Sequence, residues 1–318
     1  MQKQKAYLDR LEEKYSSPYI QIPNNLITRL KECMENEKGR DGAVFGFSYL
    51  ILNGFLYKYT HYVDVDNNDL FTHNDILVSL KKSPNSNSSS WITKSDGFLV
   101  ENEFMEKTTD IPVKIFWSAN QENPDMEIRE ILRLSDMPDY IQSIYRYDLI
   151  NSPRFSANIP DFMIDYGTKK GTLNDYRNTF QLTYKEFSYF MFSEETTLKD
   201  FAMYCLIKAK SGKERSSETS ISYEQIDLLT GVSHTVARKS MDNLSKLDII
   251  TVTKPKQNEQ SLYNRRANIY KINRKFSEKT KRKFSKEADK KFNKVRTKNR
   301  KKRWFDGYFS QNIRFRSM

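Results

Sequence analysis

Cysteine is scarce in this chain. Only Cys33 and Cys205 occur among its 318 residues, and they lie far apart in the sequence. Small secreted domains without a large core depend on several disulfides, which two distant cysteines cannot supply. The sequence therefore excludes a disulfide framework, and we expect a reducing, cytoplasmic compartment.

Histidine is also rare, and the signatures of common catalytic sites are missing. His61, His73 and His234 form no close pair, so there is neither a zinc-ligand spacing nor the His-apolar-His pair of a rolling-circle nickase. The run GTKKGT at 167–172 lacks the spacer and the Lys-Ser/Thr ending of a phosphate-binding loop. We therefore expect no enzymatic activity, no catalytic residue, no metal and no cofactor.

Long hydrophobic runs are absent as well. The most apolar stretch, residues 43–59, is shorter than the roughly 20 residues of a membrane-spanning helix. It also carries Ser, Asn, Lys and Tyr, so it predicts a buried core helix. Residues 1–17 contain no apolar segment of the kind found in secretory signals. We expect a protein without a membrane partner.

The basic side chains are distributed unevenly. From Lys271 to the end the chain holds 19 Lys and Arg against 4 Asp and Glu, whereas 34 basic and 37 acidic residues precede that point. Such a block attracts a polyanion, with nucleic acid the first expectation and an acidic membrane surface the second.

The order of predicted elements repeats weakly along the chain. The segments 19–30 and 180–191 each combine an alternating run with a helical apolar pattern, and each precedes a strongly apolar helix, a short capped helix and a further short helix. Strand-turn-strand patterns then close both halves, at 97–117 and at 248–273. This order is typical of a winged helix.

We therefore expect an α+β, mostly helical protein with two winged-helix domains in tandem. The expected parts are an N-terminal helix at 1–19, a first winged helix at 20–118, a linker with one short helix at 119–179, a second winged helix at 180–273, and a basic C-terminal helical arm at 274–318.

The stretch 222–250 is the most informative for function. Ser222 and Ser233 suit helix N-caps, and Gly231 suits the tight turn between two helices. On the second helix the apolar spacing predicts that Val236, Met241, Leu244 and Leu247 face the core. Five polar residues are then left for the outer face: His234, Thr235, Arg238, Lys239 and Asn243.

The run Gly-Val-Ser-His-Thr-Val-Ala-Arg, 231–238, resembles the helix-turn-helix of bacterial DNA-binding proteins, in which G-V-S-x-x-T-V-x-R opens the recognition helix. Here one residue, and not two, separates Ser233 from Thr235. In that motif the N-terminal turns of the second helix reach base edges and phosphates in the major groove. Ser233 and the five outer residues are thus candidate DNA contacts. The alternative is an amphipathic helix of an unrelated helical domain.

Four further basic residues fall in the loop of the second strand pair. They are Lys254, Lys256, Arg265 and Arg266. Basic wing tips contact phosphates or the minor groove, so these residues join the candidate DNA interface. A solvated hairpin loop that happens to be basic is the alternative.

The first half offers a weaker recognition segment. Residues 83–97 are rich in Ser and Asn and contain Lys94 but no Arg, with Trp91 and Ile92 as expected core anchors. We expect this half to serve in interaction, as in a homodimer interface. In the C-terminal arm, Phe276, Phe284 and Phe292 lie on one helical stripe among basic residues, and a disordered basic tail is the alternative.

Tandem winged helices with the better recognition helix in the second resemble plasmid or phage replication initiators. The resemblance implies binding of double-stranded DNA at origin repeats, a homodimer, recruitment of a host helicase or helicase loader, and a place in the bacterial cytoplasm with the nucleoid or plasmid. A winged-helix transcriptional regulator is the alternative. A nuclease or recombinase accessory is the alternative from another class, although Asp165 and Lys169 are four residues apart where a nuclease motif has two.

Overall fold

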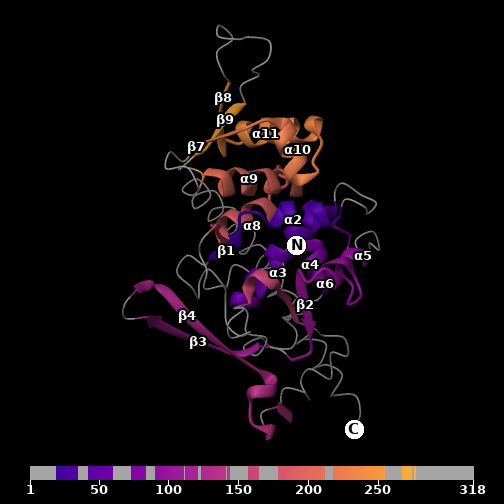
Figure 1. Cartoon of the computed structure of the whole chain (residues 1–318), viewed down its shortest axis with the longest axis vertical. Helices are drawn as coiled ribbons and strands as arrows, with labels where there is room; N and C mark the ends of the chain where they lie inside the picture. The colour runs from indigo at the N-terminus through magenta and orange to yellow at the C-terminus, as the bar shows by residue number, and fades with distance from the viewer. Residues whose placement is uncertain are drawn as a thin grey trace, which may run out of the picture. The chain divides into compact units, whose positions relative to one another are not determined.

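The computed structural model divides into two compact units, residues 1–273 and 274–318. Its described part is α+β and mostly helical, with four small antiparallel sheets (Figure 1). The structure describes residues 19–34, 42–59, 73–83, 90–110, 112–120, 123–140, 142–143, 157–164, 178–211, 218–254, 267–273 and 276.

The first half, residues 19–164, alternates helices with paired strands. Its elements are β1 (Tyr19–Pro23), α2 (Leu26–Cys33), α3 (Gly42–Tyr59), α4 (His73–Ser79), α5 (Ser90–Thr93), α6 (Phe98–Glu101), β2 (Met105–Thr108), β3 (Pro112–Asn120), β4 (Asn123–Arg133), η2 (Leu134–Asp136), β5 (Ala157–Pro160) and η3 (Asp161–Met163).

The second half, residues 178–273, has a related order. Its elements are β6 (Thr179–Thr183), α8 (Tyr184–Phe192), α9 (Leu198–Ser211), β7 (Glu218–Ile221), α10 (Tyr223–Thr230), α11 (His234–Lys246), β8 (Ile250–Thr253) and β9 (Asn268–Ile272).

The predicted core helix at 43–59 is confirmed as α3, which is buried on nearly every side. Two polar side chains in its middle donate hydrogen bonds to backbone carbonyls of the same helix. Ser48 Oγ donates to the Val44 carbonyl at 2.9 Å, and Asn53 Nδ2 donates to the Tyr49 carbonyl at 2.8 Å. None of the described helices has the length and apolar character needed to cross a membrane.

Aromatic side chains join the two halves in one core. Phe55 of α3 lies 5.2 Å from Phe187 of α8, and Phe47 of α3 lies 6.0 Å from Phe201 of α9, measured between ring centroids. Phe187 and Phe201 are in turn 5.6 Å apart. Such pairs add about 0.5–1.5 kcal/mol each beyond their burial, so the halves form a shared hydrophobic interior.

A short sheet also links the halves. β1 and β6 pair antiparallel, with Ile20 opposite Leu182 and Gln21 opposite Gln181. Gln21 and Gln181 are the central residues of their strands, so the first strands of the two predicted repeats pair directly with each other. The strand is followed in each half by a helix, a long apolar helix and two further helices (Figure 1).

The strand pairing of the first half differs from the sequence prediction. The segment 97–117 was expected to form strand, turn and strand, but its first part is α6. β2 pairs with β5, with Met105 opposite Pro160 and Thr108 opposite Ala157. The partner strand thus lies about 50 residues further along the chain, inside the expected linker 119–179, where no local pattern reveals it.

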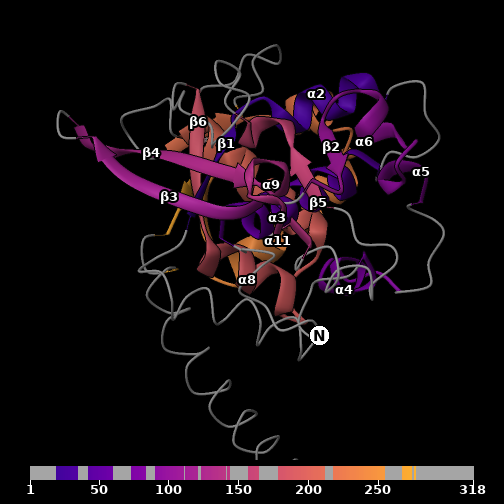
Figure 2. The same ribbon diagram turned by 90° about the horizontal axis from the view of Figure 1, so that it is seen from below.

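The short helix expected in the linker is not formed, and strand β4 stands in its place. β3 runs across the predicted domain boundary at residue 118 and pairs with β4 in a hairpin. In both views this hairpin extends away from the helices of the first half (Figure 1 and Figure 2). Its base is fastened by Arg133, which donates to Glu106 of β2 at 3.1 Å, and by Ser135, whose N–H and hydroxyl both donate to Asp110 at 2.8 Å.

The paired strands predicted at the end of the second half are confirmed. β8 and β9 pair antiparallel, with Ile250 opposite Ile272 and Val252 opposite Tyr270. β7 adds a third strand on the other side of β9. α9 packs between this sheet and α11 on one side and α3 on the other, whereas α10 packs against α11 and α2.

Candidate nucleic-acid interface

α10 begins with a complete capping box. Ser222 Oγ accepts from the Gln225 N–H at 3.2 Å, and Gln225 Oε1 accepts from the Ser222 N–H at 3.0 Å. This reciprocal arrangement satisfies two amide groups that the first turn of a helix leaves without partners. The predicted N-cap at Ser222 is therefore confirmed, and Ile226 is buried on the inner face of α10.

The turn between α10 and α11 depends on three adjacent residues. Gly231 has φ 70° and ψ 4°, and its N–H donates to the Asp227 carbonyl at 2.8 Å. The buried Thr230 hydroxyl donates to the Ile226 carbonyl at 2.7 Å and accepts from the Val232 N–H at 3.1 Å. Val232 is 3% exposed, as expected for the apolar contact between two helices. Local spacing did not predict these hydrogen bonds of Thr230.

Gly231→Ala is expected to lower the free energy of unfolding by about 1–2 kcal/mol, because a Cβ is disfavoured in the left-handed region. Gly231→Asn should cost less, since asparagine tolerates this conformation better. Urea denaturation of the two variants checks the order. Equal losses would show that the space around the turn, and not its backbone angle, requires glycine.

The inner face of α11 follows the prediction in part. Met241 and Leu244 are buried, as expected, whereas Val236 and Leu247 are only half-buried. Ala237 and Ser240 occupy the buried positions between them. The helix lies close to α9 and the β-strands, so small residues fit where larger ones were expected.

Four of the predicted contact residues form an exposed face at the start of α11. His234, Thr235, Arg238 and Lys239 are all exposed. Ser233 is the N-cap residue, and its side chain makes no capping hydrogen bond to the helix. The His234 ring lies 4.7 Å from that of Tyr223 at the start of α10, in an edge-on contact that sequence spacing did not predict. The result is a polar and basic face beside the open N-terminal turn of α11.

Asn243 differs from the prediction. It is half-buried, and its Nδ2 donates to the Glu195 carbonyl at 2.9 Å and to Asp200 Oδ2 at 3.1 Å. Glu195 lies in the connection between α8 and α9, and Asp200 lies in the first turn of α9. Because both amide hydrogens are used there, Asn243 fastens α11 to the rest of the second half and does not extend from its outer face.

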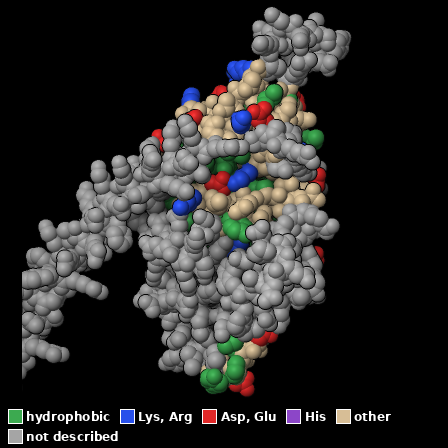
Figure 3. All heavy atoms as spheres, turned by 90° about the vertical axis from the view of Figure 1, so that its left-hand side faces the viewer, with side chains coloured by type: hydrophobic (Ala, Val, Ile, Leu, Met, Phe, Trp, Pro, Cys, Tyr) green, Lys and Arg blue, Asp and Glu red, His purple; other side chains and the backbone are tan. Residues whose placement is uncertain are grey.

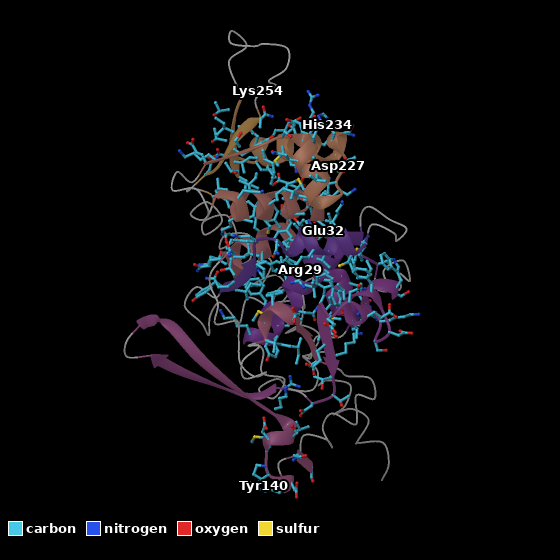
Figure 4. All side chains as sticks on the ribbon, in the orientation of Figure 1. Arg29, Glu32, Tyr140, Asp227, His234 and Lys254 are labelled. Carbon is cyan, nitrogen blue, oxygen red and sulfur yellow. The ribbon has the colours of Figure 1, made fainter. Side chains whose placement is uncertain are left out.

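The predicted wing is described only at its edges. Lys254 is exposed directly after β8, whereas Lys256, Arg265 and Arg266 lie outside the described residues. Figure 4 places Lys254 and His234 at the same end of the second half. On the face seen in Figure 3, the basic side chains of the described residues lie among acidic ones. Lys271 and Glu218 form an ion pair across β9 and β7, 2.8 Å apart.

The weaker recognition segment of the first half, 83–97, is partly outside the described residues. Its described part contains α5, where Ile92 is buried as expected and Trp91 is half-buried. The Trp91 ring packs edge-on against Phe98 of α6 at 6.1 Å, and Lys94 is exposed. The residues of the basic arm after Phe276 also lie outside the described part of the chain.

The described residues contain no group of three His, Cys, Asp or Glu side chains arranged to hold a metal ion. Cys33 is exposed and Cys205 is buried, and both are free thiols. No protein-family model, curated protein or solved structure matches the chain.

Proposed function

We propose that this chain is a sequence-specific double-stranded DNA-binding protein that reads its site with α11. The observation that carries the proposal is the polar and basic face that α11 exposes, formed by His234, Thr235, Arg238 and Lys239. The preceding helix, α10, begins with the capping box at Ser222 and ends at the Gly231 turn that leads into α11. A guanidinium on such a face can donate bidentately to guanine in the major groove, and the amide N–H groups of the first turn can donate to a phosphate.

The neighbouring elements support a winged helix for residues 198–273. The order α9, β7, α10, α11, β8, β9 agrees with that of a winged helix, and with the sheet order β7-β9-β8 the loop between β8 and β9 would be its wing. Lys254 begins that loop, and Lys256, Arg265 and Arg266 belong to it in the sequence. These positive side chains suit phosphate contacts that orient the recognition helix.

The first half supports a tandem arrangement. α3, α4 and α5 are followed by the paired strands β2 and β5, which correspond to β8 and β9 but with residues 109–156 inserted between them. The sheet formed by β1 and β6 joins the strands that begin the two halves, with Gln21 opposite Gln181. Tandem modules suit a plasmid or phage replication initiator at origin repeats, acting with a second copy of the chain and a host helicase or its loader.

Selection of bound sequences from random duplex DNA at about 150 mM salt tests the proposal, because nonspecific phosphate binding is weak at this concentration. Enriched direct repeats support an initiator. A single palindrome favours a winged-helix transcriptional regulator. No enriched sequence contradicts the proposal and leaves a protein that binds nucleic acid through charge alone.

Removal of residues 274–318 is expected to weaken binding to all DNA sequences alike. The segment is strongly basic, and each phosphate contact that is lost lowers the slope of log affinity against log salt by about 0.9. Titrations of a specific and a scrambled duplex at several salt concentrations measure both effects. Loss of affinity for the specific duplex only would show that the arm reads sequence.

A further inference from the structure

Lys81 ends α4 in a backbone conformation that favours glycine. Its φ is 58°, and the next residue, Lys82, donates its N–H to the Leu77 carbonyl at 2.9 Å, as at the end of many helices. A side chain in this region costs about 1 kcal/mol relative to glycine. The lysine is therefore a strained residue, and such residues persist where surrounding contacts hold them.

The Lys81 ammonium reaches across to the second half. It donates to the Ser193 carbonyl at 2.7 Å, to the Thr196 carbonyl, and to Thr196 Oγ1 at 3.2 Å. These acceptors lie in the connection between α8 and α9, residues 193–197, which we call the α8–α9 turn. A positive charge beside the carbonyls at the end of α8 is favourable because the helix dipole is negative there.

The α8–α9 turn is itself tightly held. The Thr196 hydroxyl donates to the Phe190 carbonyl at 2.8 Å, and Thr197 and Asp200 form a reciprocal cap at the start of α9. Thr196 and Asp200 are 3% and 2% exposed. A displacement of this turn would therefore also move the two acceptors of Asn243, which are the Glu195 carbonyl and the Asp200 carboxylate.

We propose that the α8–α9 turn couples the first half to the DNA-reading helix, with Lys81 as the positioning residue on one side and Asn243 on the other. The first half then sets the affinity of α11 for its site, so that self-association or partner binding there changes DNA binding. The consequence for DNA rests on the function proposed above. The expected effect on amide hydrogen exchange in α11 does not depend on that function.

Lys81→Gly tests the coupling without disturbing the end of α4, since glycine suits that backbone. The expected result is amide hydrogen exchange about 10-fold faster in the α8–α9 turn and in α11, measured without DNA. Affinity for a selected specific duplex should fall about 3- to 10-fold. Lys81→Arg should restore both, because a guanidinium can donate to the same carbonyls.

Glu103→Gly is the matched control, because Glu103 also has φ 58°, at the end of α6. It should leave exchange in α11 unchanged. If Lys81→Gly and Glu103→Gly behave alike in exchange and in DNA affinity, the coupling is wrong. If the wild-type chain binds no specific duplex, the proposed function fails, but faster exchange in Lys81→Gly alone still supports the coupling.

Discussion

Replacing Glu186 with Gln is expected to lower the free energy of unfolding by about 3 kcal/mol, at the lower end of what breaking a buried ion pair costs. Glu186 accepts from Lys208 Nζ at 2.6 and 2.7 Å and also from the Tyr204 hydroxyl. The Glu186 side chain is 10% exposed and that of Lys208 22%. The substitution leaves the lysine charge without its partner, and urea denaturation measures the loss.

The same carboxylate gives the stability a definite pH dependence. Burial alone raises the pKa of Glu186, but Lys208 and the hydrogen bonds from Tyr204 and Thr183 outweigh it and hold the pKa below its usual range. The folded state therefore binds the proton less readily than the unfolded state. The stabilisation is present at neutral pH and is lost as the pH falls through the acidic range, and Glu186→Gln should flatten this loss.

Glu218→Gln is the matched control for this prediction. Glu218 pairs with Lys271 at 2.8 Å, but the two side chains are 43% and 47% exposed. An exposed pair contributes less than about 1 kcal/mol because water screens it. Similar losses in the two variants would mean that burial of the Glu186 pair does not determine its contribution.

Arg238→Ala is expected to weaken binding to the selected duplex by about 1–3 kcal/mol and to relax the preference at one base position. Arg238 is exposed on α11, two turns or less from the helix start, where recognition helices approach base edges. Competition between the selected duplex and single-base variants measures the change. Unfolding should not change, since the side chain is exposed.

Lys246→Ala provides the comparison for Arg238. Lys246 is exposed on the last turn of α11, away from its N-terminal end, so its loss should weaken specific and nonspecific binding by the same small factor. An Arg238→Ala protein that keeps full specific affinity would place base recognition outside α11. The exposed segment that contains Lys94 in the first half would then be the next to test.

Local patterns predicted the second half well. The cap at Ser222, the turn at Gly231 and the buried positions of Met241 and Leu244 follow from rules that act over a few residues. The paired strands at 248–273 also followed, because the two strands are close in sequence. The exposed positions of His234, Thr235, Arg238 and Lys239 were predicted by the same helical spacing.

Pairings between distant segments were not predicted in the same way. The alternation around Met105 identifies a strand but does not reveal that its partner is β5 and not β3. Many partners satisfy the same local pattern, and the choice among them depends on tertiary packing, in which α3 lies against β5.

The sequence by itself determined the helix-turn-helix stretch, the core helix α3 and the concentration of positive charge after Lys271, because each depends on composition or on short-range spacing. Only the tertiary structure decided that Asn243 donates to the backbone before α9 and that Lys81 donates to the α8–α9 turn. A polar residue on a helix is equally suited to solvent, DNA or a buried acceptor, and the choice depends on which distant backbone groups the fold places beside it.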